Sequence, residues 1–150
     1  MKLQIRYHAD IPEIKRTAIG DWIDLRAAET VFLPEGESGM ISLGVSMRLP
    51  DGYEAHVLPR SSTYKHWGII MVNSMGLIDN SYSGDGDIWH FPAYCLSGRV
   101  MRNGRIGSLI EKGDRICQFR LVKCQPEFDI CRVDRLDGTN RGGFGSTGHR

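Results

Sequence analysis

Apolar and polar residues alternate with a period of two along much of this chain, and this pattern constrains the fold most strongly. Ile41, Leu43, Val45, Met47 and Leu49 occupy every second position, which predicts a strand over 41–49 with one buried and one polar face. Shorter runs, separated by turn residues, predict further strands over 3–7, 22–28, 53–58, 68–72, 87–96 and 115–125. Short strands at this spacing predict an all-β sandwich or jelly roll.

A helical turn, a hairpin and a tail interrupt the strand pattern. Residues 60–66 predict one helical turn, because Ser61 and Ser62 are good N-caps and Pro59 ends the preceding strand. The pair Asn103-Gly104 predicts a hairpin over 100–110. The glycines of 138–148 are too frequent to hold a strand unaided, so this stretch predicts a flexible arm. Without a repeat or a domain boundary, we expect a single domain over 1–150 with a mobile C-terminal arm over 136–150.

Charge and cysteine spacing narrow the possible partners and compartments. Nineteen basic and eighteen acidic residues nearly cancel, so the net charge predicts no nucleic-acid partner. The chain contains no signal-peptide core and no run of ~18 apolar residues, so no membrane association is expected. The four cysteines lack CxxC spacing, which indicates reduced thiols, mostly packing residues, in a cytoplasmic protein.

The stretch 76–84 carries the most chemistry for its length. Leu77 and Ile78 predict a buried strand, and Asn80-Ser81 predicts the tip of a β-hairpin. Asp79 would be ionised at neutral pH and could accept a proton from water. The alternative is a turn whose aspartate caps the backbone, and residue types alone favour that alternative.

Two clusters combine a strand or helix end with charge. Asp24 lies inside an apolar strand, which requires either a salt bridge with an arginine, such as Arg26, or a bound cation. Arg60, Ser61 and Ser62 could bind an anion where the helical turn starts, or they could form an ordinary capped turn.

Two further clusters lie near the C-terminus. Residues 113–118 turn the chain into a strand, with Gln118 facing away from Cys117; the structural alternative pairs Asp114 with Arg115. The tail resembles a phosphate loop, but it is not a Walker A motif because the lysine of that motif is missing. The alternative is a disordered tail. No GxSxG, HExxH or RNP pattern supports a serine hydrolase, a zinc enzyme or an RNA-binding module.

Together these five clusters resemble the motifs of the trimeric dUTP diphosphatase (dUTPase) family, in order and across residues 22–148. The matching segments are Asp24–Ala27, Pro59–Ser62, Gly76–Gly84, Gly113–Gln118 and Arg141–Gly148. Arg141 lies only three residues before Phe144, and this compact spacing is similar to that of phage and Gram-positive bacterial members.

The resemblance implies a distorted jelly roll with one short helix and a flexible C-terminal arm, assembled as a homotrimer with shared active sites. It implies hydrolysis of dUTP to dUMP and pyrophosphate with Mg²⁺, which Asp24 would hold through water, and with Asp79 activating the water that attacks the α-phosphorus. The implied substrate-binding residues are Arg60, Ser61, Ser62, Asn73, Gly76, Ile78, Tyr82, Gln118, Arg141, Phe144, Gly145, Ser146 and Thr147.

Two alternative functions remain open from the sequence. A dCTP deaminase would share this fold but commonly carries a glutamate near the third motif, where this chain has Asp79. A nucleotide-gated regulator on the same scaffold would bind a protein partner, and the hairpin within 97–111 is the segment that would serve it.

Overall fold

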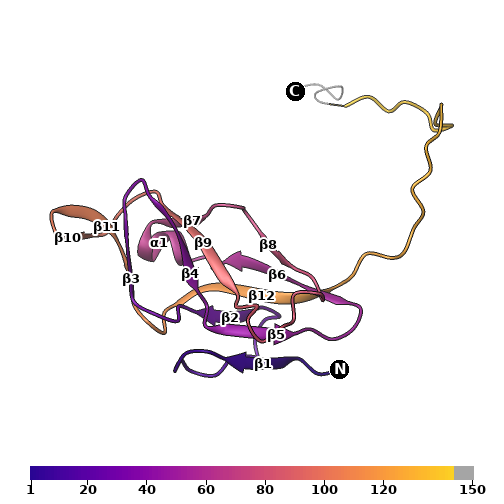
Figure 1. Cartoon of the computed structure of the whole chain (residues 1–150). Helices are drawn as coiled ribbons and strands as arrows, with labels where there is room; N and C mark the ends of the chain where they lie inside the picture. Colours follow the sequence, from indigo (N-terminus) through magenta and orange to yellow (C-terminus); the bar gives the residue numbers. More distant parts are fainter. Residues whose placement is uncertain (144–150) are drawn as a thin grey trace.

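The computed structural model describes residues 1–143, and these form a β-protein with one short helix (Figure 1). The helix α1 spans Thr63–Trp67. The strands are β1 (Gln4–Tyr7), β2 (Ile23–Arg26), β3 (Val31–Pro34), β4 (Ser38–Ser42), β5 (Val45–Arg48), β6 (Tyr53–Pro59), β7 (Ile69–Met71), β8 (Gly76–Ile78), β9 (His90–Cys95), β10 (Val100–Arg102), β11 (Arg105–Ile110) and β12 (Arg115–Lys123).

Four antiparallel sheets make up the body. Their strand orders are β1-β5, β10-β11-β3, β2-β12-β6-β8 and β4-β9-β7. In the largest sheet β12 pairs with β2 on one side and β6 on the other, which sets Gln118 opposite both Asp24 and Leu58. The all-β prediction is confirmed.

The core lies between the sheets and consists of the inward faces of the alternating strands. Trp89 and Phe119 are both buried, and their rings meet edge to face at 5.5 Å. This contact joins the entry of β9 to β12, so it ties the largest sheet to the sheet that contains β9. Apolar burial of this kind is the main source of stability in such a body.

The predicted strand over 41–49 is wrong in one respect, because the chain breaks it at Gly44. That residue has φ +64°, and a Cβ there would lie 2.8 Å from the Cβ of Ala28. β4 therefore pairs with β9, while β5 pairs with β1 in another sheet. The alternation continues through the break, so Ile41, Leu43 and Val45 are all buried even though the strand is not continuous.

The predicted hairpins had opposite outcomes. Asn103 and Gly104 have φ of +49° and +73° and close the β10–β11 hairpin as expected. The hairpin predicted at Asn80-Ser81 does not form, because β8 pairs only with β6 and the next strand, β9, belongs to another sheet. The tight turn instead precedes β8, where Ser74 has φ +62° and Met75 donates its N–H to the carbonyl of Asn73 over 2.6 Å.

Three smaller predictions also need correction. β3 was not predicted, since it is short and ends at a proline. Leu77 is 65% exposed rather than buried, because side chains alternate along β8 and its neighbour Ile78 is the one that packs against the core. Of the cysteines, Cys95 and Cys117 are buried, whereas Cys124 and Cys131 are exposed; all four are free thiols.

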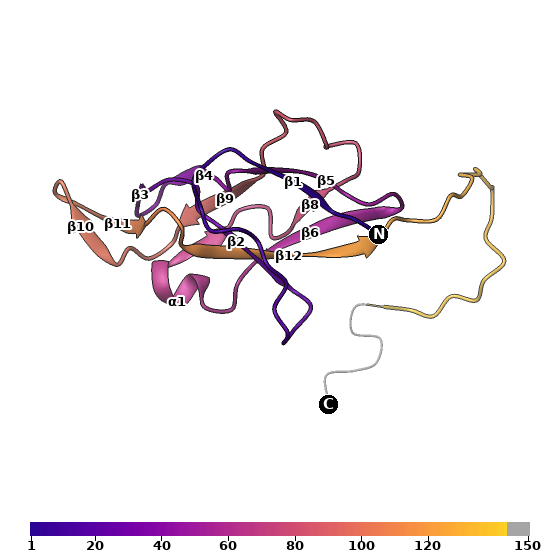
Figure 2. The same cartoon turned by 90° about the horizontal axis from the view of Figure 1, so that it is seen from below.

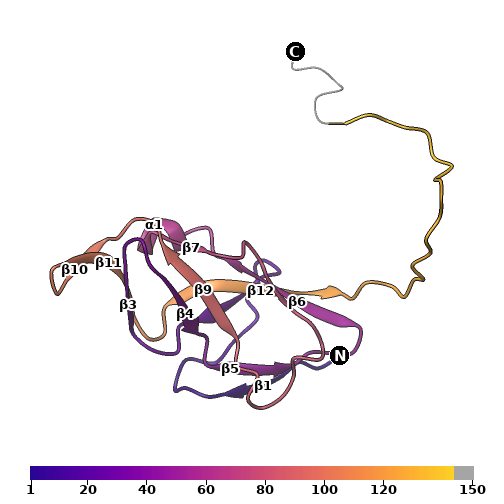
Figure 3. The same ribbon diagram turned by 45° about the horizontal axis from the view of Figure 1, so that its top comes forward.

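The chain leaves the body after β12. Residues 124–143 contain no helix or strand and are exposed throughout, and Figures 1 and 3 show this segment running away from the sheets. At the other end of the molecule the β10–β11 hairpin projects from the body, as Figure 2 shows from below. No helix within residues 1–143 is long and apolar enough to cross a membrane.

Candidate active site

An ion-pair cluster forms where β2, β6 and β12 come together, and we call Asp24, Arg60 and Arg115 the arginine cluster. Arg60 Nε donates to Asp24 Oδ1 over 2.7 Å, and Arg115 Nη1 donates to Asp24 Oδ2 over 3.1 Å. The expected salt bridge to Asp24 is therefore confirmed, but Arg26 is not the partner, because its Nη1 donates to the carbonyl of Gly113. Two planar cations thus flank one half-buried carboxylate.

The start of α1 fixes Arg60 and the two serines that follow it. Ser62 occupies the N-cap position but makes no side-chain capping bond. The buried Thr63 replaces it: its Oγ1 accepts from the N–H of Arg60 at 2.9 Å and donates to the carbonyl of Ile116 at 2.8 Å. Thr63 therefore ties this turn to β12 and leaves the side chains of Ser61 and Ser62 without that structural role.

Gln118 completes this end of the molecule. It is half-buried on β12, and its Nε2 donates to the carbonyl of Pro59 at 3.3 Å. The ion pair between Asp114 and Arg115 that the structural alternative required does not form, because Asp114 accepts the N–H of Glu111 and Arg115 binds Asp24. An open groove of about 500 Å³, lined by Arg60, Arg115, His66, Trp67, Val100 and Leu109 among others, lies beside the cluster.

A second groove gathers the residues predicted from the third motif, and we call it the Asp79 groove. It measures about 350 Å³, and its lining includes Asn73, Gly76, Ile78, Asp79 and Tyr82. Gly76 packs so closely on the body that a Cβ would lie 3.2 Å from Val57 Cβ and from Met71 Cε. A glycine here lets β8 lie close against β6, which forms one wall of the groove.

Hydrogen bonds from Ser81 hold the carboxylate of Asp79. Asp79 Oδ1 accepts the Ser81 hydroxyl and the Ser81 N–H, the latter at 2.8 Å. These bonds lower the pKa of Asp79 below its ordinary value, with the side-chain bond the largest cause. Asp79 therefore caps the turn, as the alternative interpretation expected, and also presents an exposed, ionised carboxylate.

The arginine cluster and the Asp79 groove do not meet within one chain. Ile78 pairs with Ala55 near the beginning of β6, whereas Arg60 follows its end. Five residues of extended strand separate Ala55 from Arg60, a distance of about 16 Å, and Asp79 continues in the opposite direction. The two grooves share no lining residue. One chain thus carries two groups of predicted site residues apart from each other.

The predicted arm residues fall near or beyond the end of the described part of the chain. Arg141 is exposed on the segment that leaves the body. Phe144, Gly145, Ser146 and Thr147 lie outside the described residues.

Arg115 and Thr63 are the site residues that sequence reasoning missed. Arg115 belongs to the matched fourth motif, and its charge at a strand start was the available signal. Thr63 gave no signal, because its role depends on Ile116, which only the fold brings near.

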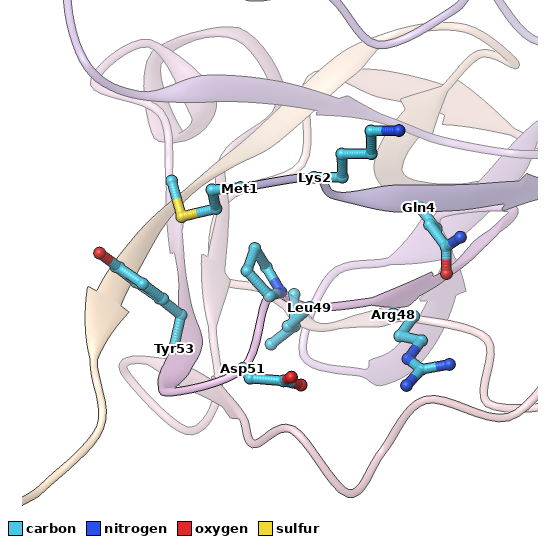
Figure 4. Close-up of a pocket in the computed structure, with 8 residues that line it drawn as sticks. Met1, Lys2, Gln4, Arg48, Leu49, Asp51 and Tyr53 are labelled. Carbon is cyan, nitrogen blue, oxygen red and sulfur yellow. The ribbon is translucent and has the colours of Figure 1, made fainter.

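Metal-binding capacity within residues 1–143 is limited, since no group of three or more His, Cys, Asp or Glu side chains is arranged to hold a metal ion. Another hollow, about 440 Å³, lies between the N-terminus and the turn after β5, where Figure 4 shows Met1, Gln4, Arg48 and Tyr53 among its lining residues. None of the predicted site residues that fall within residues 1–143 lines it.

Comparisons with known proteins agree with the motifs. The family model for dUTPase matches residues 15–148. The SPbeta prophage-derived deoxyuridine 5'-triphosphate nucleotidohydrolase of Bacillus subtilis is 52% identical over 149 residues, covering 99% of each chain. A deoxyuridine 5'-triphosphate nucleotidohydrolase of Finegoldia magna is 35% identical, with 99% of this chain and 100% of that protein covered.

Solved structures support the same fold. The dUTPase of Staphylococcus bacteriophage 80alpha with dUPNHPP superposes with a TM-score of 0.79 at 22% identity, covering 98% of each chain. A dUTPase variant from phage phi11 of S. aureus, described for its coordination of a structural Mg(II) ion, gives 0.75 at 19% identity, covering 92% of this chain and 100% of that one. The predicted fold class is confirmed, and so is the resemblance that the five motifs carried.

Proposed function

Because the chain belongs to the dUTPase family, we propose that it hydrolyses dUTP to dUMP and pyrophosphate, with Asp79 as the general base. The Asp79 groove is the observation that carries this proposal. It gathers an amide, a carboxylate and a tyrosine, Asn73, Asp79 and Tyr82, in one hollow beside an exposed strand edge. Such a groove suits a nucleoside whose base, sugar and α-phosphate need separate contacts.

Within the groove each residue has a distinct task. Asn73 and the backbone of Gly76 and Ile78 bind the uracil edge, and Tyr82 packs under the deoxyribose where a ribose 2′-OH would clash. Asp79 accepts a proton from a water molecule, and the oxygen of that water bonds to the α-phosphorus. The bond from the α-phosphorus to the oxygen that bridges it to the β-phosphorus then breaks, which releases pyrophosphate. An ionised carboxylate suits this step, and the bonds from Ser81 favour that ionised form.

The phosphates are bound by groups that sit apart from the Asp79 groove. Arg60, Ser61, Ser62 and Gln118 contact the triphosphate, and Arg115 supports Arg60 by sharing Asp24. The C-terminal arm adds Arg141 to the γ-phosphate, Phe144 to the uracil face, and Gly145, Ser146 and Thr147 to phosphate oxygens. Positive groups aimed at a transferring phosphoryl group stabilise charge that develops in the transition state.

Mg²⁺ fits the donor set at the arginine cluster. This ion commonly binds through one or two carboxylates plus substrate phosphates and keeps several waters, so it requires no cage of protein ligands. Asp24 offers one half-buried carboxylate, both of whose oxygens already bind guanidinium groups, which favours contact through water over direct ligation. Bound with the triphosphate, Mg²⁺ would neutralise negative charge on the phosphate oxygens.

A homotrimer with shared sites accounts for the separation of the two groups. The Asp79 groove of one chain would face the arginine cluster of a second chain, and the arm of the third would close over both. The exposed apolar side chains of the departing segment support burial against another copy, with Phe128 at 61%, Ile130 at 90% and Leu136 at 79% exposure. The single-domain organisation, the mobile arm and the cytoplasmic location also stay predictions.

Pyrophosphate release tests the activity directly. We expect release from dUTP with Mg²⁺ at least a hundredfold faster than from UTP, dTTP or dCTP, because a site built for one base and sugar penalises each misfit. Equal rates on all four nucleotides would contradict the proposal. Conversion of dCTP to dUTP would instead establish the deaminase alternative, which lacks support here because no glutamate of the described part of the chain lines the Asp79 groove.

The hairpin supports a second role as a partner surface. β10 and β11 carry Met101 and Ile106 directly opposite each other, 64% and 48% exposed, beside the basic Arg102 and Arg105. We propose that a regulatory protein partner binds here. Affinity capture of a protein partner by the wild type and by a variant with a shortened hairpin, still closed by Asn103-Gly104, would test this. Equal capture of the partner by both would contradict it.

A further inference from the structure

The loop that carries Tyr82 is held from outside the Asp79 groove by the N-terminal strand pair. Tyr82 lies within residues 79–89, which connect β8 to β9 without a strand of their own. Both ends of this connection are fixed: Ile78 pairs with Ala55, and the N–H of Trp89 donates to the carbonyl of Val45 at 2.8 Å. The position of Tyr82 therefore depends on what holds the middle of the connection.

Ser46 provides the middle anchor. Its hydroxyl donates to the backbone carbonyl of Asp85 over 3.2 Å, three residues beyond Tyr82. Ser46 is only 3% exposed, so the bond is buried at its serine end, and its loss would leave polar groups there without a partner. His8 Nε2 lies 2.9 Å from the same hydroxyl oxygen and donates to it when Ser46 donates to Asp85.

Arg6 adds a second contact to the same loop residue. It pairs across the sheet with Ser46 and forms an ion pair with the carboxylate of Asp85. The two side chains are 56% and 81% exposed, so solvent screens this pair and it contributes less than the partly buried bond from Ser46. Arg6, His8 and Ser46 thus meet on one face of the β1–β5 ladder, and we call them the β1–β5 clamp.

The loop transmits this anchoring to Tyr82 over a short distance. Gly84 donates its N–H to Asp87 Oδ2 at 2.7 Å, and Asp87 donates its N–H back to the carbonyl of Gly84 at 3.1 Å. Asp85 sits inside this closed turn, so holding Asp85 holds the turn. Tyr82 Oη contacts the carbonyl of Ile88 at 3.3 Å, which spans the same turn from its other side.

We propose that Ser46, assisted by Arg6 and His8, is a positioning residue for sugar selection at Tyr82, although it touches no substrate. This rests on the proposed function, in which the ring of Tyr82 excludes a ribose 2′-OH. A Tyr82 ring that shifts by a fraction of an ångström would admit the extra oxygen of a ribose. Discrimination between dUTP and UTP is therefore more sensitive to the clamp than the rate of dUTP hydrolysis is.

The decisive measurement is the ratio of kcat/KM for dUTP to that for UTP. Ser46→Ala should lower this ratio roughly fivefold, equivalent to about 1 kcal/mol, chiefly by improving turnover of UTP. Ser46→Thr keeps the hydroxyl and should restore the ratio. Arg6→Ala should lower it less, and Arg48→Ala is the matched control, since Arg48 is an exposed arginine on β5 for which the described structure records no ion pair.

Hydrogen–deuterium exchange of the nucleotide-free protein gives a second readout. Peptides covering 79–88 should exchange faster in Ser46→Ala than in the wild type, and those of β12 should not. A folded Ser46→Ala protein with an unchanged ratio and unchanged exchange overturns the proposal, as does an Arg48→Ala effect equal to that of Arg6→Ala. A uniform rise in KM for both nucleotides also overturns it, because sugar selection would then be unaffected.

Two further outcomes remain decisive. If Ser46→Ala does not fold, Arg6→Ala combined with His8→Ala, both at exposed positions, decides by the same ratio. If the wild type does not hydrolyse dUTP, the proposed function falls, and faster exchange over 79–88 in the clamp variants still decides whether the clamp holds the loop.

Discussion

Arg60 and Asp24 form an ion pair at 2.7 Å, with Arg60 Nε donating to Asp24 Oδ1 just beyond the end of β6. The pair orients the guanidinium before any nucleotide arrives, and Arg115 approaches the other carboxylate oxygen at 3.1 Å. The carboxylate therefore has two functions on the proposed mechanism: it positions a phosphate-binding cation, and it faces the triphosphate as the acid that would hold Mg²⁺ through water.

Asp24→Asn should impair both functions of this carboxylate strongly while destabilising the fold only slightly. We expect kcat/KM for dUTP to fall at least tenfold and the Mg²⁺ concentration for half-maximal rate to rise, because the amide carries no charge for either partner. The unfolding free energy should fall by about 1 kcal/mol, which corresponds to a Tm lowered by about 2–4 °C. Asp51→Asn, an exposed turn residue, serves as the control. An unaltered Mg²⁺ dependence would argue against Asp24 as the carboxylate that holds Mg²⁺ through water.

Asp79→Asn should preserve nucleotide binding and remove turnover. The amide fills the same volume but accepts no proton, so we expect kcat to fall by about 10²–10⁴-fold while the Kd for a non-hydrolysable dUTP analogue stays within a few-fold of the wild type. Calorimetric titration and pyrophosphate release measure the two quantities. Substantial turnover by a correctly assembled variant would rule Asp79 out as the base.

Ser81→Ala should move the acid side of the pH profile. The proposed base works when ionised, so activity is present above the pKa of Asp79 and is lost as pH falls through it. The Ser81 bonds lower that pKa, and removing the hydroxyl should raise it again, shifting the acid limb of kcat/KM to higher pH. Ser83→Ala gives the matched comparison in the same loop. A limb that stays in place in Ser81→Ala would show that this hydroxyl does not tune the base.

Mixed assemblies test whether sites are shared. Asp79→Asn and Arg60→Ala should each be inactive alone. Co-expressed with different affinity tags and purified for both, they should regain activity, because a site between chains can take Asp79 from one and Arg60 from the other. Random assortment would restore about a quarter of the sites before selection for both tags. Failure to regain activity in verified mixed assemblies would mean that one chain supplies both residues.

Truncation after Asn140 removes Arg141 and the glycine-rich end that follows it. Turnover should fall at least tenfold while the molecular mass by light scattering still corresponds to the proposed trimer, because the exposed apolar residues that we propose to pack against another copy, Phe128, Ile130 and Leu136, lie before the cut. The chain that ends at Arg150 is the reference. A truncated protein as active as the reference would exclude the arm from catalysis.

Sequence patterning predicted most of this fold, and its failures have physical causes. The β10–β11 hairpin followed from Asn103-Gly104, whose positive φ values are a local property. The break at Gly44 could not be foreseen, because the contact that demands it, with Ala28, is long-range. The turn at Asn80-Ser81 was misread for the same reason: turn residues indicate a change of direction but not the strand with which the chain pairs next.

The site was predictable in composition and not in arrangement. The first four motifs named Asp24, Arg60, Asp79, Tyr82 and Gln118. The fold places Asp24, Arg60 and Gln118 near one end of β6 and the other two in a separate groove. Nothing in the spacing of these residues along the chain distinguishes one complete site from two halves. That information lies in the pairing of β8 with β6, which is a tertiary property.

The placement of Asp79 and Arg60 toward opposite ends of β6 has a consequence for how activity scales with the amount of protein. If each working site draws on several copies, dilution removes sites as well as molecules, and specific activity falls once the concentration approaches that at which the assembly dissociates. A cell that makes few copies would then have almost no dUTP-hydrolysing capacity, and a modest rise in synthesis would bring a disproportionate gain. In such a shared-site assembly, the geometry of a single strand would couple nucleotide turnover to the number of chains that the cell makes.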